Sequence, residues 1–87
     1  MRVGLVVVLL AFATPALAGS FCTDAPPRNW PTKAEMMDRI RAMGHQISAF
    51  KTTDGNCYEI YGKDKSGKRV EVYFHSVTGK VVKSPSL

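Results

Sequence analysis

The sequence predicts an α+β domain, in which one amphipathic helix packs on a three- to four-stranded antiparallel β-meander that is stapled by a disulfide. Three observations predict it: a helical apolar period after residue 32, a period of two after residue 46, and two cysteines in a chain that begins with an export signal. They divide the chain into a signal peptide (1–18), an extended arm (19–31), the domain itself (32–83) and a loose tail (84–87).

The first 18 residues have the three parts of an export signal. Arg2 supplies a positive end, and residues 3–12 are an apolar run that is long enough for a signal core but too short to span a bilayer. Pro15 then breaks the helix before small residues that end at Ala18. The alternatives are a buried helix or an uncut anchor, but a buried amphipathic helix needs a polar face, which this run lacks. We expect cleavage after Ala18 and a periplasmic or secreted bacterial protein with no membrane span in its mature form.

The mature chain is small and moderately basic. It keeps 11 of the 12 Lys and Arg residues and all 7 acidic residues, so its net charge falls from +5 to +4. About a dozen apolar side chains are available for one core, which is marginal for a single domain without a covalent staple. Charge alone permits an anionic partner, but no nucleic-acid partner is expected outside the cytoplasm.

Cys22 and Cys57 are the candidate staple. An oxidising compartment favours one disulfide between them, and closing a loop of this length contributes roughly 4 kcal/mol in the chain-entropy model. Two free thiols or a metal pair are the alternatives. Neither cysteine has a C-x-x-C spacing or a histidine at ligand spacing, and no metal site is expected.

The arm and the helix have clear boundaries. Prolines at 26, 27 and 31 exclude helix and central strand from the arm, and Trp30 is expected to cap the core. Thr32 and Glu35 form a capping box at the start of the helix. An apolar stripe of Met36, Ile40 and Met43 should face the sheet, and Gly44 should end the helix in the left-handed conformation.

Strands are expected at residues 47–52, 57–63, 69–75 and 80–83. Ile47 and Phe50 cannot share a face of the first strand without a bulge. A regular four-residue turn at 64–67 would pair Ile60 with the charged Glu71, so a bulge at Gly67 is expected there.

The ordered strand motifs resemble the PepSY domain. The resemblance is carried by Gly55-Asn56-Cys57-Tyr58-Glu59-Ile60, by the run from Asp64 to Tyr73 (DKSGKRVEVY), and by Thr78-Gly79-Lys80-Val81-Val82. It covers about residues 30–83 and implies a non-catalytic binding or inhibitory module outside the cytoplasm, such as a modulator of a protease. One departure is His75-Ser76, where the family often has Asp-Pro or Asp-Ala.

No catalytic constellation is visible in the sequence. His45 and His75 are far apart and read as surface residues, a disulfide would remove the cysteine nucleophile, and no cofactor is expected. The face of the sheet away from the helix should carry mixed charges and two tyrosines, an arrangement suited to recognition. The candidate residues for binding a protein partner in the cell envelope are Tyr61, Tyr73, Lys63, Arg69 and His75.

A second interpretation stays open. Lys63, Lys65, Lys68 and Arg69 cluster at one predicted turn, where they could attract a polyanion or an anionic membrane surface, or only blunt the edge of the sheet. In that case the chain is a structural or envelope polypeptide with weak binding at most. Oligomeric state is not predicted by either interpretation.

Overall fold

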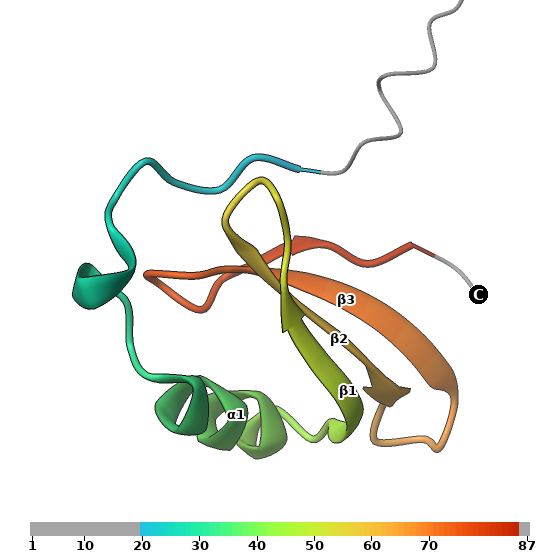
Figure 1. Ribbon diagram of the computed structural model, residues 1–87. Coiled ribbons are helices and arrows are strands. Elements are labelled where there is room, and N and C mark those ends of the chain that lie inside the picture. Colours follow the sequence, from blue (N-terminus) through green and yellow to red (C-terminus); the bar gives the residue numbers. More distant parts are fainter. Residues whose placement is uncertain (1–19, 86–87) are drawn as a thin grey trace, which may run out of the picture.

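The computed structural model describes residues 20–85 and confirms the predicted α+β class (Figure 1). The predicted signal peptide and the last two residues of the tail lie outside the described residues. The elements are a short 3-10 turn, one helix and four strands: η2 (Pro27–Asn29), α1 (Lys33–Ala42), β1 (Gln46–Thr52), β2 (Cys57–Lys63), β3 (Arg69–His75) and β4 (Val81–Lys83).

The capping box at the start of α1 is confirmed. The Glu35 backbone N–H donates to Thr32 Oγ1 at 3.1 Å, and the Thr32 backbone N–H donates to Glu35 Oε1 at 2.8 Å. Gly44 has φ +102°, as expected of a left-handed helix stop. The apolar stripe is shorter than predicted, because α1 ends at Ala42 and Met43 stands beyond its last turn with 41% of its surface exposed.

The four strands form one antiparallel sheet whose spatial order, β1-β2-β3-β4, repeats their order in the chain. Figure 1 shows α1 below this sheet, with the N-terminal arm passing the turn between β1 and β2 before it descends to the helix. The buried core lies between α1 and the sheet and consists of Met36, Ile40, Tyr58, Ile60, Val72 and Phe74.

Trp30 closes one end of this core, as predicted. It packs against the buried cluster, with its ring centroid 5.6 Å from that of Tyr58 in a T-shaped contact. Its Nε1–H donates to the carbonyl oxygen of Ala25 at 3.0 Å, which satisfies the one polar atom of the indole.

The bulge expected at Gly67 is present in the sheet, and so is a bulge in β1, whose inward face the sequence left undecided. The register of β1 shifts between Ile47 and Ala49, which leaves Ser48 as the extra residue and lets Ile47 and Phe50 both pack on the core. Gly67 has φ +85°, and the turn it completes pairs Lys63 with Arg69. Ile60 therefore lies opposite Val72, not opposite Glu71.

The disulfide is also confirmed. Cys22 and Cys57 are bonded, with their Cα atoms 5.2 Å apart, and Cys57 is fully buried. The arm runs beside the turn between β1 and β2, where the Cys22 N–H donates to the Gly55 carbonyl at 2.8 Å. The staple thus joins the arm to the start of β2, which is an interior strand of the sheet.

Candidate functional site

The helix-free face of the sheet is built from cross-strand pairs. On β2 and β3 these pairs are Cys57 with His75, Glu59 with Tyr73, Tyr61 with Glu71, and Lys63 with Arg69. Strand β1 adds Lys51 opposite Glu59, and β4 adds Lys83 opposite Tyr73. Alternation along each strand places these side chains on the side away from α1. The predicted site residues therefore share one surface, in rows of differing charge.

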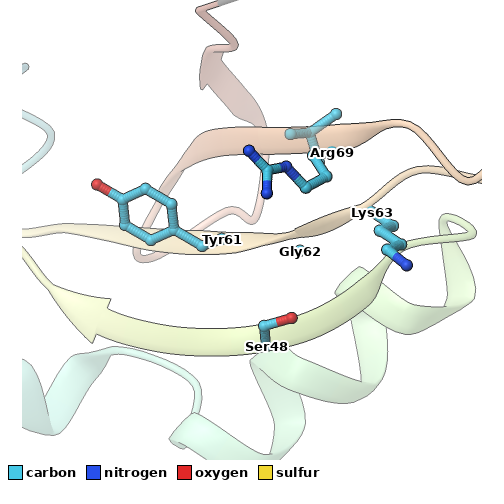
Figure 2. Close-up of a pocket in the computed structure, with 6 residues that line it drawn as sticks. Ser48, Tyr61, Gly62, Lys63 and Arg69 are labelled. Carbon is cyan, nitrogen blue, oxygen red and sulfur yellow. The ribbon is translucent and has the colours of Figure 1, made fainter. Parts of the chain in front are cut away.

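A hollow of about 580 Å³ opens at the end of this face nearest the β2–β3 turn (Figure 2). Its lining residues come from three neighbouring strands and are Ser48, Tyr61, Gly62, Lys63, Arg69 and Val70. Figure 2 shows the Tyr61 ring and the Arg69 guanidinium group extending on the same side of the sheet. The structure thus brings together three of the five predicted binding residues.

Two local features shape the hollow. Ser48 is the extra residue of the β1 bulge, so the edge of the sheet bends beside Tyr61. Gly62 leaves room for the close approach of β1, since a Cβ at this position would lie 1.7 Å from the carbonyl oxygen of Gln46. The sequence indicated only that Ile47 and Phe50 cannot share a face without a bulge, and it did not indicate the hollow.

Tyr73 lies opposite Glu59, one row beyond the pair of Tyr61 and Glu71, and is held by contacts with other residues of the face. It is half-buried, and its hydroxyl donates to Glu71 Oε2 at 3.0 Å. The Lys83 ammonium stands 5.0 Å from the centre of its ring, within cation–π distance. Burial, followed by the bond to Glu71, raises the pKa of the Tyr73 phenol. Tyr61 differs, because 39% of its surface is exposed.

His75 and Ser76, the two residues that depart from the family pattern, hold the turn before β4. His75 Nδ1 accepts hydrogen bonds from the backbone N–H groups of Val77 and Thr78, at 3.2 and 3.3 Å. Ser76 is fully buried, and its hydroxyl donates to the Asn56 carbonyl at 2.7 Å. An aspartate at 75 would offer the same turn an acceptor of another kind, so this imidazole serves the local fold.

Glu59 lies on this face but is shielded from solvent. Its relative exposure is 2%, and its Oε1 lies 3.6 Å from Lys51 Nζ. Within the described chain, Oε2 has no hydrogen-bond donor. Burial, followed by hydrogen bonding with Glu71, raises the pKa of the Glu59 carboxyl. Hydrogen bonding with Glu59 lowers the pKa of the Glu71 carboxyl.

His45 also differs from the surface role expected of it. Its ring packs edge-on against Phe74, with centroids 6.2 Å apart, and its Nδ1 is buried without a partner among residues 20–85. Over the same residues, no three His, Cys, Asp or Glu side chains gather as metal ligands would. In the part of the chain that the structure describes, the face carries two tyrosines, four Lys or Arg side chains and two acids, of which only Glu59 is buried.

No helix in the described part of the chain is both long and apolar enough to cross a membrane. A family model described as "Peptidase propeptide and YPEB domain" (PepSY_2) matches residues 2–85. Neither the curated proteins nor the solved structures include a significant match to the chain.

Proposed function

The chain belongs to the peptidase propeptide and YPEB domain family, and on that premise we propose that it is an exported, non-catalytic module that binds a protein partner on its helix-free face. The partner class that the family favours is a peptidase, whose activity the module would modulate as a propeptide does. The observation that carries the proposal is the hollow, where the exposed Tyr61 ring stands beside Lys63 and Arg69.

The build of this face supports binding. Tyrosine contributes a large contact area with few rotatable bonds, and arginine and tyrosine are both enriched where binding energy concentrates. These side chains stand on strands of a sheet that packs against α1 on its other side and is tied to the arm by the disulfide. A rigid support of this kind lowers the entropy cost of binding. Tyr73 and His75 are more deeply engaged in internal contacts, so we assign them the supporting part of the surface.

Export is part of the proposal. The disulfide is consistent with an oxidising compartment, and residues 1–18 have the pattern of a cleaved signal. Intact-mass measurement of the protein recovered from the exported fraction should give a chain that starts at Gly19. A mass that includes residues 1–18 would exclude cleavage and leave the module anchored by its N-terminus.

The function is tested with immobilised, oxidised residues 19–87 and the exported proteins of the source organism. We expect a peptidase among the captured proteins, inhibited on addition of the soluble module. Tyr61→Ala should weaken capture at least tenfold and leave the circular dichroism spectrum unchanged, because Tyr61 does not contribute to the core.

Phe21→Ala is the matched control, since Phe21 is an aromatic residue of the arm with 64% of its surface exposed. It should bind like the wild type. Full capture by Tyr61→Ala together with lost capture by Phe21→Ala would move the site to the arm and defeat the proposal. Turnover of a substrate by the purified module would defeat its non-catalytic part.

A structural or envelope role is the second candidate, and the basic turn between β2 and β3 is the observation that favours it. The Asp64 carboxylate there is engaged within the turn, where its Oδ1 accepts from Ser66 and from the Lys68 N–H. Lys65 and Lys68 are exposed. This role predicts salt-sensitive binding to anionic vesicles that a Lys65→Gln/Lys68→Gln variant loses and Tyr61→Ala keeps.

A further inference from the structure

We propose that the hollow beside Tyr61 is a carboxylate-binding pocket, which accepts an acidic side chain from an extended segment of the protein partner between Lys63 and Arg69. This inference rests on the proposed function and names the chemistry by which that face would select its partner.

Lys63 and Arg69 form an unfavourable pair of like charges. Lys63 and Arg69 lie directly opposite each other on β2 and β3, and like charges in that relation destabilise a sheet. Neither makes an ion pair with any described residue, since the acid pairs of residues 20–85 are Arg41 with Asp38 and Lys51 with Glu59. Both side chains are exposed, and a carboxylate bound beside them would offset their repulsion.

The size and lining of the hollow suit an acidic side chain. At about 580 Å³ the hollow is larger than a small inorganic anion needs and suits one or two side chains of a peptide. The Tyr61 ring supplies apolar surface, along which the methylene groups of a glutamate could pack, whereas the Val70 side chain packs on the core. The Ser48 hydroxyl and the guanidinium group of Arg69 supply hydrogen-bond donors for the carboxylate.

The acids of the neighbouring rows restrict the kind of anion that can bind. Glu71 pairs with Tyr61 in the row next to the cations, and Glu59 follows two residues along β2. Lys51 and Lys83 stand in the row of Glu59, whereas Lys63 and Arg69 share a row in which no described residue is an acid. One carboxylate of a peptide can occupy that row alone, whereas a polyanion or a lipid surface that spread over the face would also meet Glu71.

The probe is a pair of capped peptides, N-acetyl-tetraglutamate amide and N-acetyl-tetraglutamine amide, titrated into ¹⁵N-labelled oxidised residues 19–87 at low ionic strength. We expect saturable shifts of the backbone amides of Ser48, Tyr61, Lys63 and Arg69 with the glutamate peptide, and binding at least tenfold weaker for the glutamine peptide. Lys63→Gln/Arg69→Gln should lose the response while folding at least as stably as the wild type, because it removes a repulsive pair.

The matched control is Lys65→Gln/Lys68→Gln, which changes the same net charge on the same turn but leaves the lining intact. It should bind the glutamate peptide within about twofold of the wild type. Equal losses in the two double variants would show diffuse electrostatic attraction and overturn the pocket. Saturable binding of inorganic phosphate or of phosphatidylglycerol vesicles in preference to the peptide would overturn the choice of a peptide carboxylate.

The same variants separate this inference from the proposed function. If capture of the partner depends on Tyr61 but not on Lys63 and Arg69, the binding face stands and the carboxylate pocket is wrong. If the glutamate peptide binds as expected and no partner capture depends on Tyr61, the pocket stands and the proposed function fails.

Discussion

The Glu59 carboxylate and the Lys51 ammonium group lie 3.6 Å apart across β1 and β2, yet one is shielded from solvent and the other is not. The Glu59 side chain is 3% exposed, whereas that of Lys51 is 62% exposed. An ion pair with one partner in water contributes little, so it does not offset the burial of the carboxylate. The burial of the Glu59 carboxyl is therefore not compensated by this ion pair, and it raises the pKa of the group.

Glu59→Gln should change the dependence of stability on pH. The pKa of Glu59 is raised above its ordinary value of 4.5, so the folded protein binds more protons than the unfolded chain between pH 4.5 and that raised value. The free energy of unfolding should fall as pH rises through this interval. Gln removes the effect, and denaturant titrations at neutral pH should show a gain on the order of 1 kcal/mol.

Glu71 has the opposite sign, because its pKa is lowered from 4.5. Its contribution is present above pH 4.5 and is lost as pH falls through the lowered value. Asp38→Asn is the control for Glu59→Gln, since this acid is 82% exposed and should leave the pH profile unchanged. An identical profile for Glu59→Gln and the wild type would show that Glu59 does not carry the effect.

Loss of the disulfide should cost a large part of the stability of the domain. The bond closes a loop across a sequence separation of 35 residues, for which the chain-entropy model gives roughly 4 kcal/mol. Cys22→Ser/Cys57→Ser should lower the free energy of unfolding by a few kcal/mol, measured by denaturant titration. Addition of reductant should do the same to the wild type and have no effect on the double variant. Unchanged stability in both tests would contradict a stapling role.

Gly62→Ala should destabilise the sheet and distort the hollow. The added Cβ would meet the backbone oxygen of Gln46, which cannot move without breaking the pairing of β1 with β2, so we expect a loss of about 1–3 kcal/mol. Gly67→Ala separates crowding from backbone strain. Its Cβ would have no neighbour within 4 Å, and its φ of +85° costs about 1 kcal/mol in an L-residue. A Gly62→Ala loss no greater than that of Gly67→Ala would argue against the close approach.

The two methionines of the predicted stripe should respond differently to truncation. Met36 is fully buried, and Met36→Ala should cost about 2–5 kcal/mol through lost contacts and the cavity left behind. Met43 stands 41% exposed beyond the last turn of α1, so Met43→Ala should change the free energy of unfolding by less than about 1 kcal/mol. Thermal unfolding of the two variants side by side checks the difference. Equal losses of stability would show that Met43 contributes to the core as Met36 does.

Most of the fold could be predicted from the sequence, because each element has a local cause. The capping box of Thr32 and Glu35 sets the start of the helix, and the parity of Ile60 against Val72 requires the bulge at Gly67. The conflict between Ile47 and Phe50 left the inward face of β1 undecided. It could not show that Ser48 is the extra residue, since the position of a bulge is decided by how the neighbouring strand packs.

The candidate site was predicted less completely, because alternation assigns a side chain to a face but does not give its exposure. Glu59 was placed on the helix-free face, yet its burial depends on Lys51 and Tyr73, which neighbouring strands bring against it. His75 was expected to be available for binding, and only the path of the turn reveals that its Nδ1 accepts two backbone bonds. The hollow joins residues from three strands, so no single segment could have indicated it.

The strand order β1-β2-β3-β4 has a consequence for folding kinetics. Every pairing in the sheet joins segments that follow each other along the chain, so each hairpin closes a short loop and none awaits a crossover from a distant segment. Proteins rich in such local contacts fold faster than those built on long-range pairings, and we expect the main phase of stopped-flow refolding with the disulfide intact to lie in the range of milliseconds to a second. Starting from reduced chains, oxidation of Cys22 with Cys57 should appear as a separate, slower phase, since thiol chemistry takes seconds to hours.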